Sequence, residues 1–356
     1  TNITNVGRII QQLHLQFDFI HEEQMRAGEL SRYRVLVLPW SSAISDAEAA
    51  AIRAFVEAGG TVIADSFCGV RDDHGRARPM LDDLFGIRQP LDPPELAHAT
   101  LTVSPEAELG LASVPVASGC ADLEVVDGDA AGSIAGAPAL IARDQGAGTA
   151  VFLNCSFSNY MQVEETGVAG ETQEETLSAE GVTQPIRSLM AALLSKAGVA
   201  PAFRIDAGDL APQLETSRQL VGDVELIGVL RSINSGAIDR EDTLPYALVL
   251  PEARHVYDVR AGAYLGEVDR VEGEALRGVA QLYALLPGRV TGLTVQGPAT
   301  AQPGEALEFA LSLRAEGGAP AGHVIRVEVQ APGEAAEDRY WYARNLTTAA
   351  GRASFV

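Results

Sequence analysis

Lysine and cysteine are scarce in this sequence of 356 residues, and each shortage excludes a class of protein. Lys196 is the only lysine, and it lies in an apolar run with no glycine-rich loop before it. A P-loop needs a lysine beside the phosphates and a Schiff-base enzyme needs one as its nucleophile, so neither class fits. The motifs G-x-S-x-G, G-x-G-x-x-G and C-x-x-C are also absent, which removes the α/β-hydrolase, dinucleotide-binding and thioredoxin classes. We therefore expect no cofactor.

The three cysteines, Cys68, Cys120 and Cys155, are too scattered for a disulfide framework or a zinc site, and their odd number leaves at least one unpaired. No run of 18 apolar residues exists, so we expect no membrane span. The first ten residues lack the basic start and the apolar run of a signal peptide. Because there is no initiator methionine and the last residues read as a strand, we expect a segment of a longer protein whose compartment stays open.

Acidic residues outnumber basic ones, 48 to 26, which gives a net charge of −22. That charge repels the phosphate backbone on which nucleic-acid affinity depends, so DNA and RNA are not expected partners. Hydrophobic residues make up 47% of the chain and charged residues 21%, which is the balance of a folded soluble protein. The length predicts two domains and part of another.

The clearest pattern is a strand, a helix and a second strand near the N-terminus. The run Arg34–Pro39 is continuous and apolar, as in a strand that is covered on both faces. Ser45 and Glu48 then form a capping box, and Gly59-Gly60 ends the helix that follows. A second apolar run at 61–65 completes the pattern. It predicts a βαβ unit with two parallel strands.

Less regular patterns flank this unit. We expect, in chain order, a helix at 6–15, a strand at 17–20, a hairpin of 138–143 with 149–154 at one edge of the sheet, and a closing helix from Pro185 to Gly198. The acidic stretch Glu164–Glu180 lies between the hairpin and the closing helix. It is predicted to be a loop that faces solvent or another subunit.

Beyond Pro201 the hydrophobic period changes from helical to two, which predicts strands. We expect these strands at 224–230, 246–250, 255–259 and 279–286, and further ones in LTVQGP, ALEFALSLRA and HVIRVEVQAP. A tight turn belongs at Ala261-Gly262. The sequence thus predicts an α/β domain at 1–200 that lacks its first strand, a small all-β domain at 201–287 and a truncated immunoglobulin-like β-sandwich at 288–356.

The segment YRVLVLPWSSAISDAEAAAIRAFVEAGGTVIADSFCGVRDD resembles the middle domain of family-42 beta-galactosidases, which is called the trimerisation domain. The shared features are a strand ending in Leu-Pro, a Ser-Asp helix cap, Phe-Val-x-Ala-Gly-Gly, and a strand that runs into a Gly-x-x-Asp loop. The resemblance implies a flavodoxin-like fold of the class I glutamine amidotransferase-like superfamily over the first ~200 residues, and self-association as a trimer.

In that family the catalytic carboxylates lie on a TIM barrel before this domain. Nothing in this chain matches a barrel, so no catalytic glutamate is carried over. The β-modules that follow are similar to those of multidomain bacterial proteins that act on carbohydrates, which makes carbohydrate an implied partner of the whole protein.

Cys68 is the sharpest catalytic candidate, because active members of this superfamily place a nucleophilic cysteine just after a strand, on a turn into a helix. In this sequence a polar loop follows Cys68 instead. No histidine occurs between the strand at 149–154 and His255, where the base is expected. We therefore interpret Cys68 as a small buried packing residue.

A metal site is the second candidate. Asp72, Asp73 and His74 offer carboxylate and imidazole ligands beside a glycine turn, but three consecutive side chains point in different directions, which favours a solvated turn. His21-Glu22-Glu23 begins like the zincin motif but lacks its second histidine.

Sugar contact is the third candidate. Trp40 and Trp341 can stack on sugar rings, although aromatic side chains at strand ends more often pack in cores or interfaces. The glutamates of the acidic stretch can bind calcium or serve as the paired carboxylates of a glycosidase. A flexible loop does not fix the distance between two carboxylates that glycoside hydrolysis needs.

Three functions follow from these patterns. The favoured one is a non-catalytic assembly or accessory segment of a larger, carbohydrate-active protein that self-associates through its α/β domain. The alternatives are a cysteine-dependent amidotransferase or hydrolase that uses Cys68, and a cell-envelope or glycan-binding module that acts through its β-domains.

Overall fold

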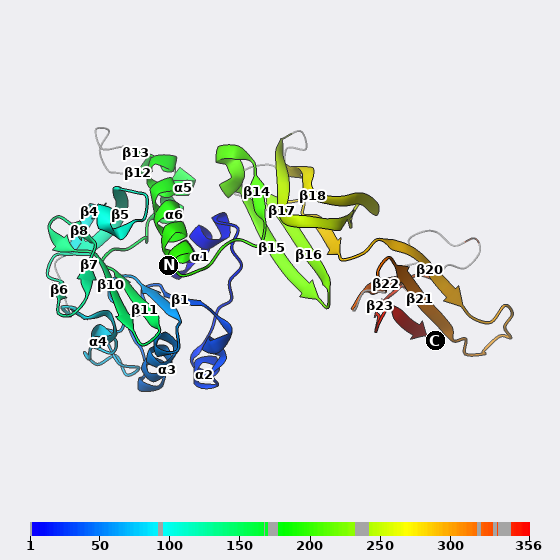
Figure 1. Cartoon of the computed structure of the whole chain (residues 1–356), viewed down its shortest axis with the longest axis horizontal. Coiled ribbons are helices and arrows are strands. Elements are labelled where there is room, and N and C mark those ends of the chain that lie inside the picture. Colours follow the sequence, from blue (N-terminus) through cyan, green and yellow to red (C-terminus); the bar gives the residue numbers. More distant parts are fainter. Residues whose placement is uncertain are drawn as a thin grey trace. The chain divides into compact units, whose positions relative to one another are not determined.

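The computed structural model describes residues 2–91, 95–166, 168–169, 177–231, 242–318, 322–329, 333 and 343–356. The chain forms two compact units, Thr1–Pro201 and Ala202–Val356 (Figure 1). Each unit has its own sheets and its own buried apolar clusters. The further division of the second unit after residue 287 stays a prediction.

The predicted βαβ unit is present in the first unit. β1 (Val35–Leu38) pairs in parallel with β2 (Thr61–Ala64), and α3 (Asp46–Glu57) connects them. The Glu48 N–H donates to the Ser45 hydroxyl at 3.2 Å, and the Ser45 N–H donates to the Glu48 carboxylate at 2.8 Å. This reciprocal pair satisfies N–H groups that the helix start leaves unpaired, which explains why the helix begins here.

The central sheet of this unit has the order β1-β2-β11-β10-β7. β11 (Gly148–Leu153) is parallel to β2, whereas β10 (Leu140–Gln145) and β7 (Asp129–Ala130) extend the sheet with antiparallel pairs. The predicted hairpin is therefore present as β10 and β11, but its position at a sheet edge is wrong. β11 is the middle strand, because its apolar side chains are covered on both faces of the sheet.

Helices cover both faces of this sheet, so it is the middle of three layers (Figure 1). One face packs against α1 (Asn2–Gln12), α5 (Tyr160–Thr166) and α6 (Ala179–Lys196). The other face packs against α2 (Glu22–Arg26), the 3-10 helix η1 (Glu29–Arg32), α3 and α4 (Asp82–Phe85). Strand side chains alternate between the layers: Ile63 belongs to the first cluster and Val62 to the second.

Several short strands of the first unit are not among the sequence-based predictions. A four-stranded antiparallel sheet has the order β5-β4-β8-β9, and two further pairs are β3 with β6 and β12 with β13. Their bounds are β3 Ile87–Arg88, β4 Glu95–Val103, β5 Ser113–Cys120, β6 Glu124–Val125, β8 Gly132–Ile134, β9 Ala137–Pro138, β12 Val168–Ala169 and β13 Leu177–Ser178. A short 3-10 helix, η2 (Pro105–Ala107), follows β4.

Two helices differ from their predicted bounds. α1 begins at Asn2 rather than at residue 6, and it ends at Gln12. α6 begins at Ala179 and contains Pro185, so the proline does not start it. The Glu180 carboxylate in its first turn accepts a hydrogen bond from Arg187 Nη2 at 2.6 Å, which ties the added turns to the rest of the helix.

Two other predictions for the first unit are wrong. Residues 17–20 form no strand, because among the described residues no backbone pairs with them. The acidic stretch is not one continuous loop. Glu164 and Glu165 lie in α5 and Glu180 lies in α6, whereas Glu171, Glu174 and Glu175 lie outside the described residues.

The second unit is made of strands. Its main sheet has the order β14-β17-β19-β16-β15, with β18 paired to β17. The bounds are β14 Arg204–Asp206, β15 Leu214–Val221, β16 Val224–Arg231, β17 Thr243–Asp258, β18 Ala263–Leu276 and β19 Gln281–Leu286, and η3 (Gly208–Gln213) precedes β15. The strands predicted at 246–250 and 255–259 are one strand, β17, with an irregularity between Val249 and Arg254. The predicted turn at Ala261-Gly262 joins β17 to β18.

The C-terminal part of this unit carries two smaller antiparallel sheets, β20-β21-β24 and β22-β23. Their bounds are β20 Val290–Gln296, β21 Phe309–Ala315, β22 Val324–Val327, β23 Arg344–Thr347 and β24 Arg352–Phe355. β21 and β22 lie within two of the alternating runs from which strands were predicted, and β20 overlaps the third but begins three residues before it.

Candidate functional site

The polar residues of interest follow the carboxyl ends of the parallel strands. Trp40 comes two residues after β1, Asp65 to Cys68 follow β2, and Asn154 and Cys155 follow β11. In open α/β sheets this edge is where ligands usually bind, so it is the first place to look for chemistry. In this chain most of these side chains are buried: Asp65, Cys68, Asn154 and Cys155 are each no more than 4% exposed.

Asp65 is the most perturbed carboxyl group at this edge. Burial raises its pKa to about 8, against the opposing effect of hydrogen bonds from the Trp40 N–H and from the Asn2 side chain. The Asn2 Oδ1 atom is buried and has no hydrogen-bond partner within the described ranges. A protonated Asp65 can donate to this oxygen once the Asn2 amide is rotated, which fits a neutral carboxyl group.

Cys68 lies at the strand end that the sequence indicates, but it is fully buried. Burial raises the pKa of its thiol well above the ordinary value, and the charges of Asp65 and Asp82 raise it further. Its carbonyl accepts a hydrogen bond from Gln89 Nε2 at 2.8 Å, and the residues that follow form turns, with the next helix starting at Asp82. A thiolate nucleophile needs the opposite environment, with a helix N-terminus or a nearby cation.

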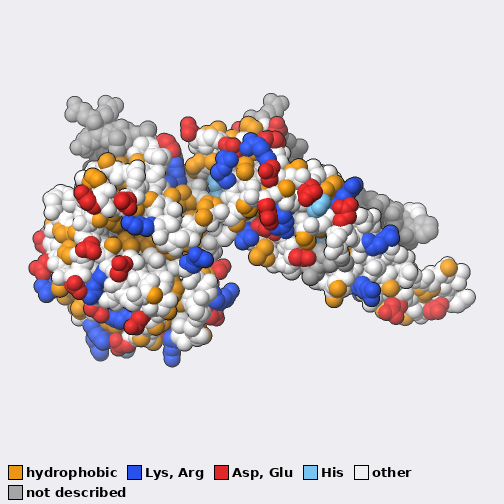
Figure 2. All heavy atoms as spheres, viewed as in Figure 1, with side chains coloured by type: hydrophobic (Ala, Val, Ile, Leu, Met, Phe, Trp, Pro, Cys, Tyr) orange, Lys and Arg blue, Asp and Glu red, His pale blue; other side chains and the backbone are white. Residues whose placement is uncertain are grey.

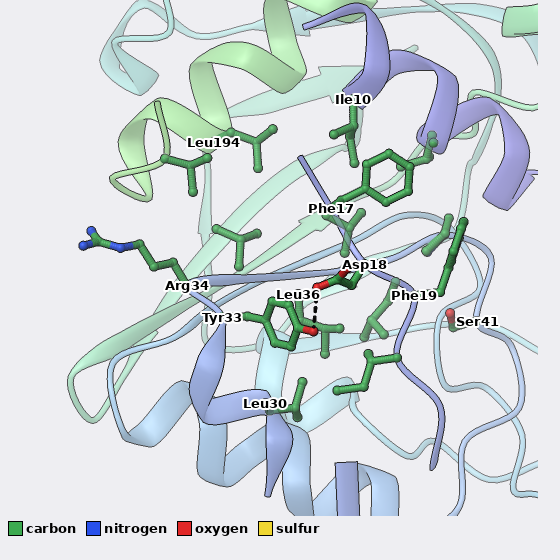
Figure 3. Close-up of a pocket in the computed structure, with 18 of the residues that line it drawn as sticks. Ile10, Phe17, Asp18, Phe19, Leu30, Tyr33, Arg34, Leu36, Ser41 and Leu194 are labelled. Atoms are coloured by element: carbon green, nitrogen blue, oxygen red, sulfur yellow. Dashed lines mark hydrogen bonds between the residues drawn. The ribbon is translucent and has the colours of Figure 1, made fainter. Parts of the chain in front are cut away.

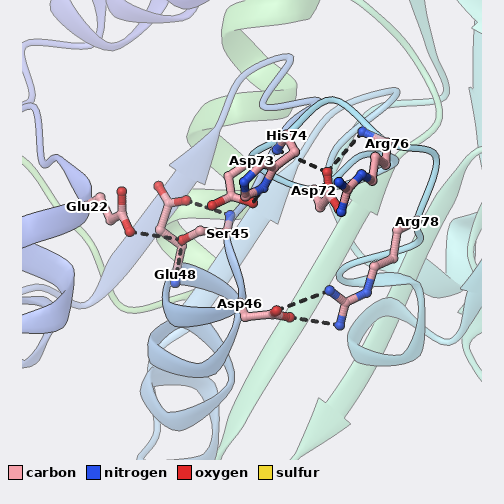
Figure 4. Close-up of polar contacts among 9 residues, drawn as sticks. All are labelled: Glu22, Ser45, Asp46, Glu48, Asp72, Asp73, His74, Arg76 and Arg78. Atoms are coloured by element: carbon pink, nitrogen blue, oxygen red, sulfur yellow. Dashed lines mark hydrogen bonds and ion pairs between the residues drawn. The ribbon is translucent and has the colours of Figure 1, made fainter.

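Asp72, Asp73 and His74 do come together, with ligand atoms within 4.8 Å of one another. Their polar atoms already have protein partners (Figure 4): Asp72 accepts from the backbone N–H of His74 and of Arg76, and Asp73 contacts His74 Nδ1 at 2.8 Å. These contacts lower the pKa of Asp72 and raise that of His74. The side chains of Asp73 and His74 are largely exposed, so the group forms an open polar turn near the start of α3.

Of the two tryptophans considered for sugar contact, the structure describes only Trp40. Trp40 is 42% exposed, with its ring tilted against Phe67 at 5.0 Å between centroids. Both residues have positive φ angles, which non-glycine residues adopt at a cost when the surrounding structure holds them. Trp341 lies outside the described residues.

A cavity that the sequence did not indicate lies elsewhere, beside β1. We call it the β1 groove; it has a volume of about 790 Å³. Figure 3 shows Ile10 and Leu194 above it, Leu30 and Leu36 below it, and Phe17 across it. Among its lining residues, the Tyr33 hydroxyl donates to the Asp18 carboxylate at 3.0 Å, and Arg34 Nη1 donates to the Gly198 carbonyl at 3.4 Å. The cavity forms where residues 3–52 meet residues 194–200, which are far apart in the sequence. No local sequence pattern therefore indicates it.

The surface charge is mixed in sign on the face that Figure 2 shows. On the face shown in Figure 2, basic side chains lie scattered among acidic ones and form no continuous basic surface. The net charge of −22 agrees with this distribution. Among the residues that the structure describes, no helix is long and apolar enough to cross a membrane.

Residues 8–176 match the family model of the beta-galactosidase trimerisation domain. This segment is a trimerisation-type domain of that family. It includes the βαβ unit, all of the strand-end residues described above and most of the β1 groove. The resemblance stated from the sequence is thereby confirmed. No protein of curated function matches the chain at a significant level.

Several solved structures share the fold of this chain. The beta-galactosidase from Bacillus circulans sp. alkalophilus has a TM-score of 0.59 and 14% identity, over 80% of this chain and 38% of that one. A GH42 beta-galactosidase from G. stearothermophilus has a TM-score of 0.57 and 15% identity, over 79% and 35%. The beta-galactosidase from Rahnella sp. R3 has a TM-score of 0.54 and 14% identity, over 79% and 36%. The chain thus spans little more than a third of the length of these proteins.

Proposed function

We propose that this chain is a non-catalytic assembly segment of a larger, carbohydrate-active protein, and that its first unit brings copies of the protein together as a trimer. The observation that carries the proposal is the match of residues 8–176 to the trimerisation domain. The carbohydrate context rests on the similar structures, all three of which are beta-galactosidases.

Finer fold assignments belong to the same proposal. We assign the first unit to the flavodoxin-like folds of the amidotransferase-like superfamily, which is supported by three adjacent parallel strands, β1, β2 and β11, with helices on both faces. We assign residues 288–356 to an immunoglobulin-like sandwich, which is supported by the antiparallel pairs of β20, β21 and β24 and of β22 and β23.

The burial and the contacts of the strand-end residues support the proposal that this segment is not catalytic. Cys68 has no access to solvent, and besides burial the acids Asp65 and Asp82 raise the pKa of its thiol. Both acids disfavour a thiolate, so the cysteine-dependent alternative has no observation in its favour. Asp72, Asp73 and His74 bind one another and the backbone, which leaves the metal alternative without support beyond proximity.

The oligomeric mass of residues 1–356 in solution tests the proposal. Light scattering over a hundredfold range of protein concentration is expected to show a species of three times the 37.5 kDa of one chain. The net charge of −22 opposes association, so raising the salt to about 0.5 M shortens the screening length and is expected to favour the trimer. A mass of one chain under all these conditions contradicts the proposal. A stable dimer would also contradict the trimer, although it would leave self-association intact.

A further inference from the structure

The second unit consists of a main sheet and smaller C-terminal sheets, and a short linker joins the two parts. β19 ends at Leu286 and β20 begins at Val290. The linker residue Gly288 is buried, and a Cβ atom added to it would lie 1.9 Å from the carbonyl oxygen of Glu316. The Glu316 N–H donates to the Arg289 carbonyl at 2.8 Å. The linker is therefore packed against the residue that follows β21.

One contact between the two parts lies at this linker, and we call it the linker contact. The Val290 N–H, at the start of β20, donates to the Tyr257 hydroxyl of β17 at 2.8 Å. The Arg289 guanidinium lies 4.8 Å from the centre of the Tyr264 ring of β18, which is the geometry of a cation–π contact. Val290 also packs against the buried cluster that contains Leu286 of β19. These contacts hold the start of β20 on the main sheet.

A second contact lies at the turn between β15 and β16, and we call it the turn contact. Gly322, which precedes β22, lies close to Val221 at the end of β15: an added Cβ atom would be 3.3 Å from both a methyl carbon and the carbonyl oxygen of Val221. The next residue, His323, is half-buried. Its N–H donates to the Thr348 hydroxyl at 3.0 Å, and its carbonyl accepts from the Thr348 N–H at 2.7 Å. His323 therefore has a fixed position beside the turn.

The imidazole of His323 makes the turn contact sensitive to pH. Burial lowers the pKa of this imidazole from its ordinary value of 6.5. Among the described residues, Asp223 in the turn is the charged group that acts on it, and it opposes the effect of burial only in part. An open contact would expose the imidazole and return its pKa to the ordinary value. The closed contact thus has its full stability above pH 6.5 and loses stability as the pH falls below that value.

We propose that the turn contact is an acid-sensitive latch: it holds the C-terminal sheets against the main sheet while the His323 imidazole is neutral, and it opens when that imidazole takes a proton. A charged imidazole is poorly hydrated when it is half-buried beside the turn, so protonation favours the open contact. The linker contact acts as the hinge. The imidazole near it, His255, bonds the Tyr264 hydroxyl within the main sheet, so this bond does not cross between the two parts. The latch is independent of assembly through the first unit.

The distance between two exposed positions, one on each side of the turn contact, measures opening. Gln219 of β15 and Arg326 of β22 are both exposed. Gln219→Cys and Arg326→Cys are introduced together into the whole chain, and both new cysteines carry nitroxide labels. The native cysteines are buried, so the label reacts at the introduced positions. Pulsed electron paramagnetic resonance gives the distribution of label-to-label distances at pH 7.5 and pH 5, with labelled chains diluted among unlabelled ones.

In the labelled chain, the fraction of molecules with a longer distance is expected to rise at least ~3-fold between pH 7.5 and pH 5. His323→Gln keeps a polar side chain that cannot take a proton, so this fraction is expected to be the same at both pH values. His255→Gln is the matched control, because it removes the imidazole near the linker contact, and it is expected to retain the response to acid.

Equal distance distributions at the two pH values in the labelled chain would overturn the proposal. A response to acid that persists in His323→Gln, or that disappears in His255→Gln, would assign the response to another group and would also overturn it. Circular dichroism at both pH values reports the strand content. A longer distance that appears together with a loss of strands would be unfolding rather than the opening of a latch, and it would contradict the proposal too.

Discussion

Two regions of the central sheet of the first unit differ in how many of their polar groups are buried and hydrogen-bonded within the protein. At the carboxyl ends of β2 and β11, Asp65, Cys68 and Asn154 are buried. The Asn154 side chain alone bonds the backbone of Cys120 twice and that of Pro138 once. Along β1, in contrast, half of the strand's backbone groups face an apolar groove without described partners. The closed region is the sheet edge where open α/β folds usually bind ligands, and the open region offers apolar area rather than reactive groups. This contrast favours assembly over catalysis.

The largest expected effect comes from the closed region and concerns pH. The pKa of Asp65 is raised to about 8 in the folded chain from 3.8, so between these values the folded state holds a proton that the unfolded state has lost. Its stabilising contribution is full below pH 4 and is lost as the pH rises through 8. At about 1.4 kcal/mol for each pKa unit, the loss over this window is on the order of 5 kcal/mol.

Urea unfolding between pH 5 and 8.5 measures this loss, with Trp40 fluorescence as the probe in a Trp341→Phe background. Asp65→Asn is the matched variant, because the amide imitates the neutral acid and cannot ionise. Its free energy of unfolding is expected to vary much less with pH. An equally steep pH dependence in the variant would assign the effect to another group.

The next prediction compares the stability lost when a phenylalanine is replaced in the core and when one is replaced at the open edge. Phe152 in β11 is 1% exposed, and Phe19 beside the groove is 70% exposed. Phe152→Ala is expected to cost about 3 to 5 kcal/mol of unfolding free energy, and Phe19→Ala less than ~0.5 kcal/mol. Chemical unfolding of the whole chain measures both. Similar losses would mean that the segment at 17–20 is packed as a core strand after all.

How far the sequence determined these two regions can be judged from particular residues. The βαβ unit was predictable because Ser45, Glu48 and Gly59-Gly60 are local signals for a helix start and end. The middle position of β11 was not, because its pairing with β2 joins strands some ninety residues apart. Residues 17–20 have the composition of a strand, but a strand also needs a neighbour, which local patterns do not report.

For the candidate site residues, too, the sequence predicts local features but not tertiary packing. The sequence placed Cys68 at a strand end and gave the polar loop after it, and both are present. It did not indicate that Asp65 is desolvated enough to raise its pKa, since burial results from the packing of α1 and of the loops after β1 and β11. The β1 groove is likewise a product of tertiary structure.

A third prediction tests whether the closed region is chemically inert. Burial and two acids raise the pKa of the Cys68 thiol. Iodoacetamide at pH 7 is therefore expected to label Cys68 far more slowly than it labels the thiol of glutathione. The two rates are expected to become equal only after the protein is unfolded in urea. Mass spectrometry of the labelled peptides measures the rate, and glutamine is expected to remain unhydrolysed. Cys68→Ser is expected to cost ~1 to 3 kcal/mol of stability, because it buries a hydroxyl. Rapid labelling at pH 6 together with glutamine hydrolysis, both lost in Cys68→Ser, would make this segment an enzyme.

The smallest expected effect concerns the cap of α3, between the two regions. The Ser45 hydroxyl accepts from the Glu48 N–H, so Ser45→Ala is expected to cost about 1 kcal/mol of unfolding free energy. Ser45→Thr is the control, because it keeps the hydroxyl and is expected to restore most of the loss. Equal losses in both variants would indicate that packing of the side chain, rather than the cap, stabilises the helix start.

Residue-level amide exchange of the 356-residue chain at low protein concentration tests the contrast between the two regions most directly. Val62 and Ile63 lie in β2, which is paired on both sides, and Val35 and Val37 lie at the open edge of β1. We predict that the amides of Val35 and Val37 exchange at least ~100-fold faster than those of Val62 and Ile63. Equal, slow exchange of all four amides would show that the edge of β1 is already closed and would contradict this account of the sheet.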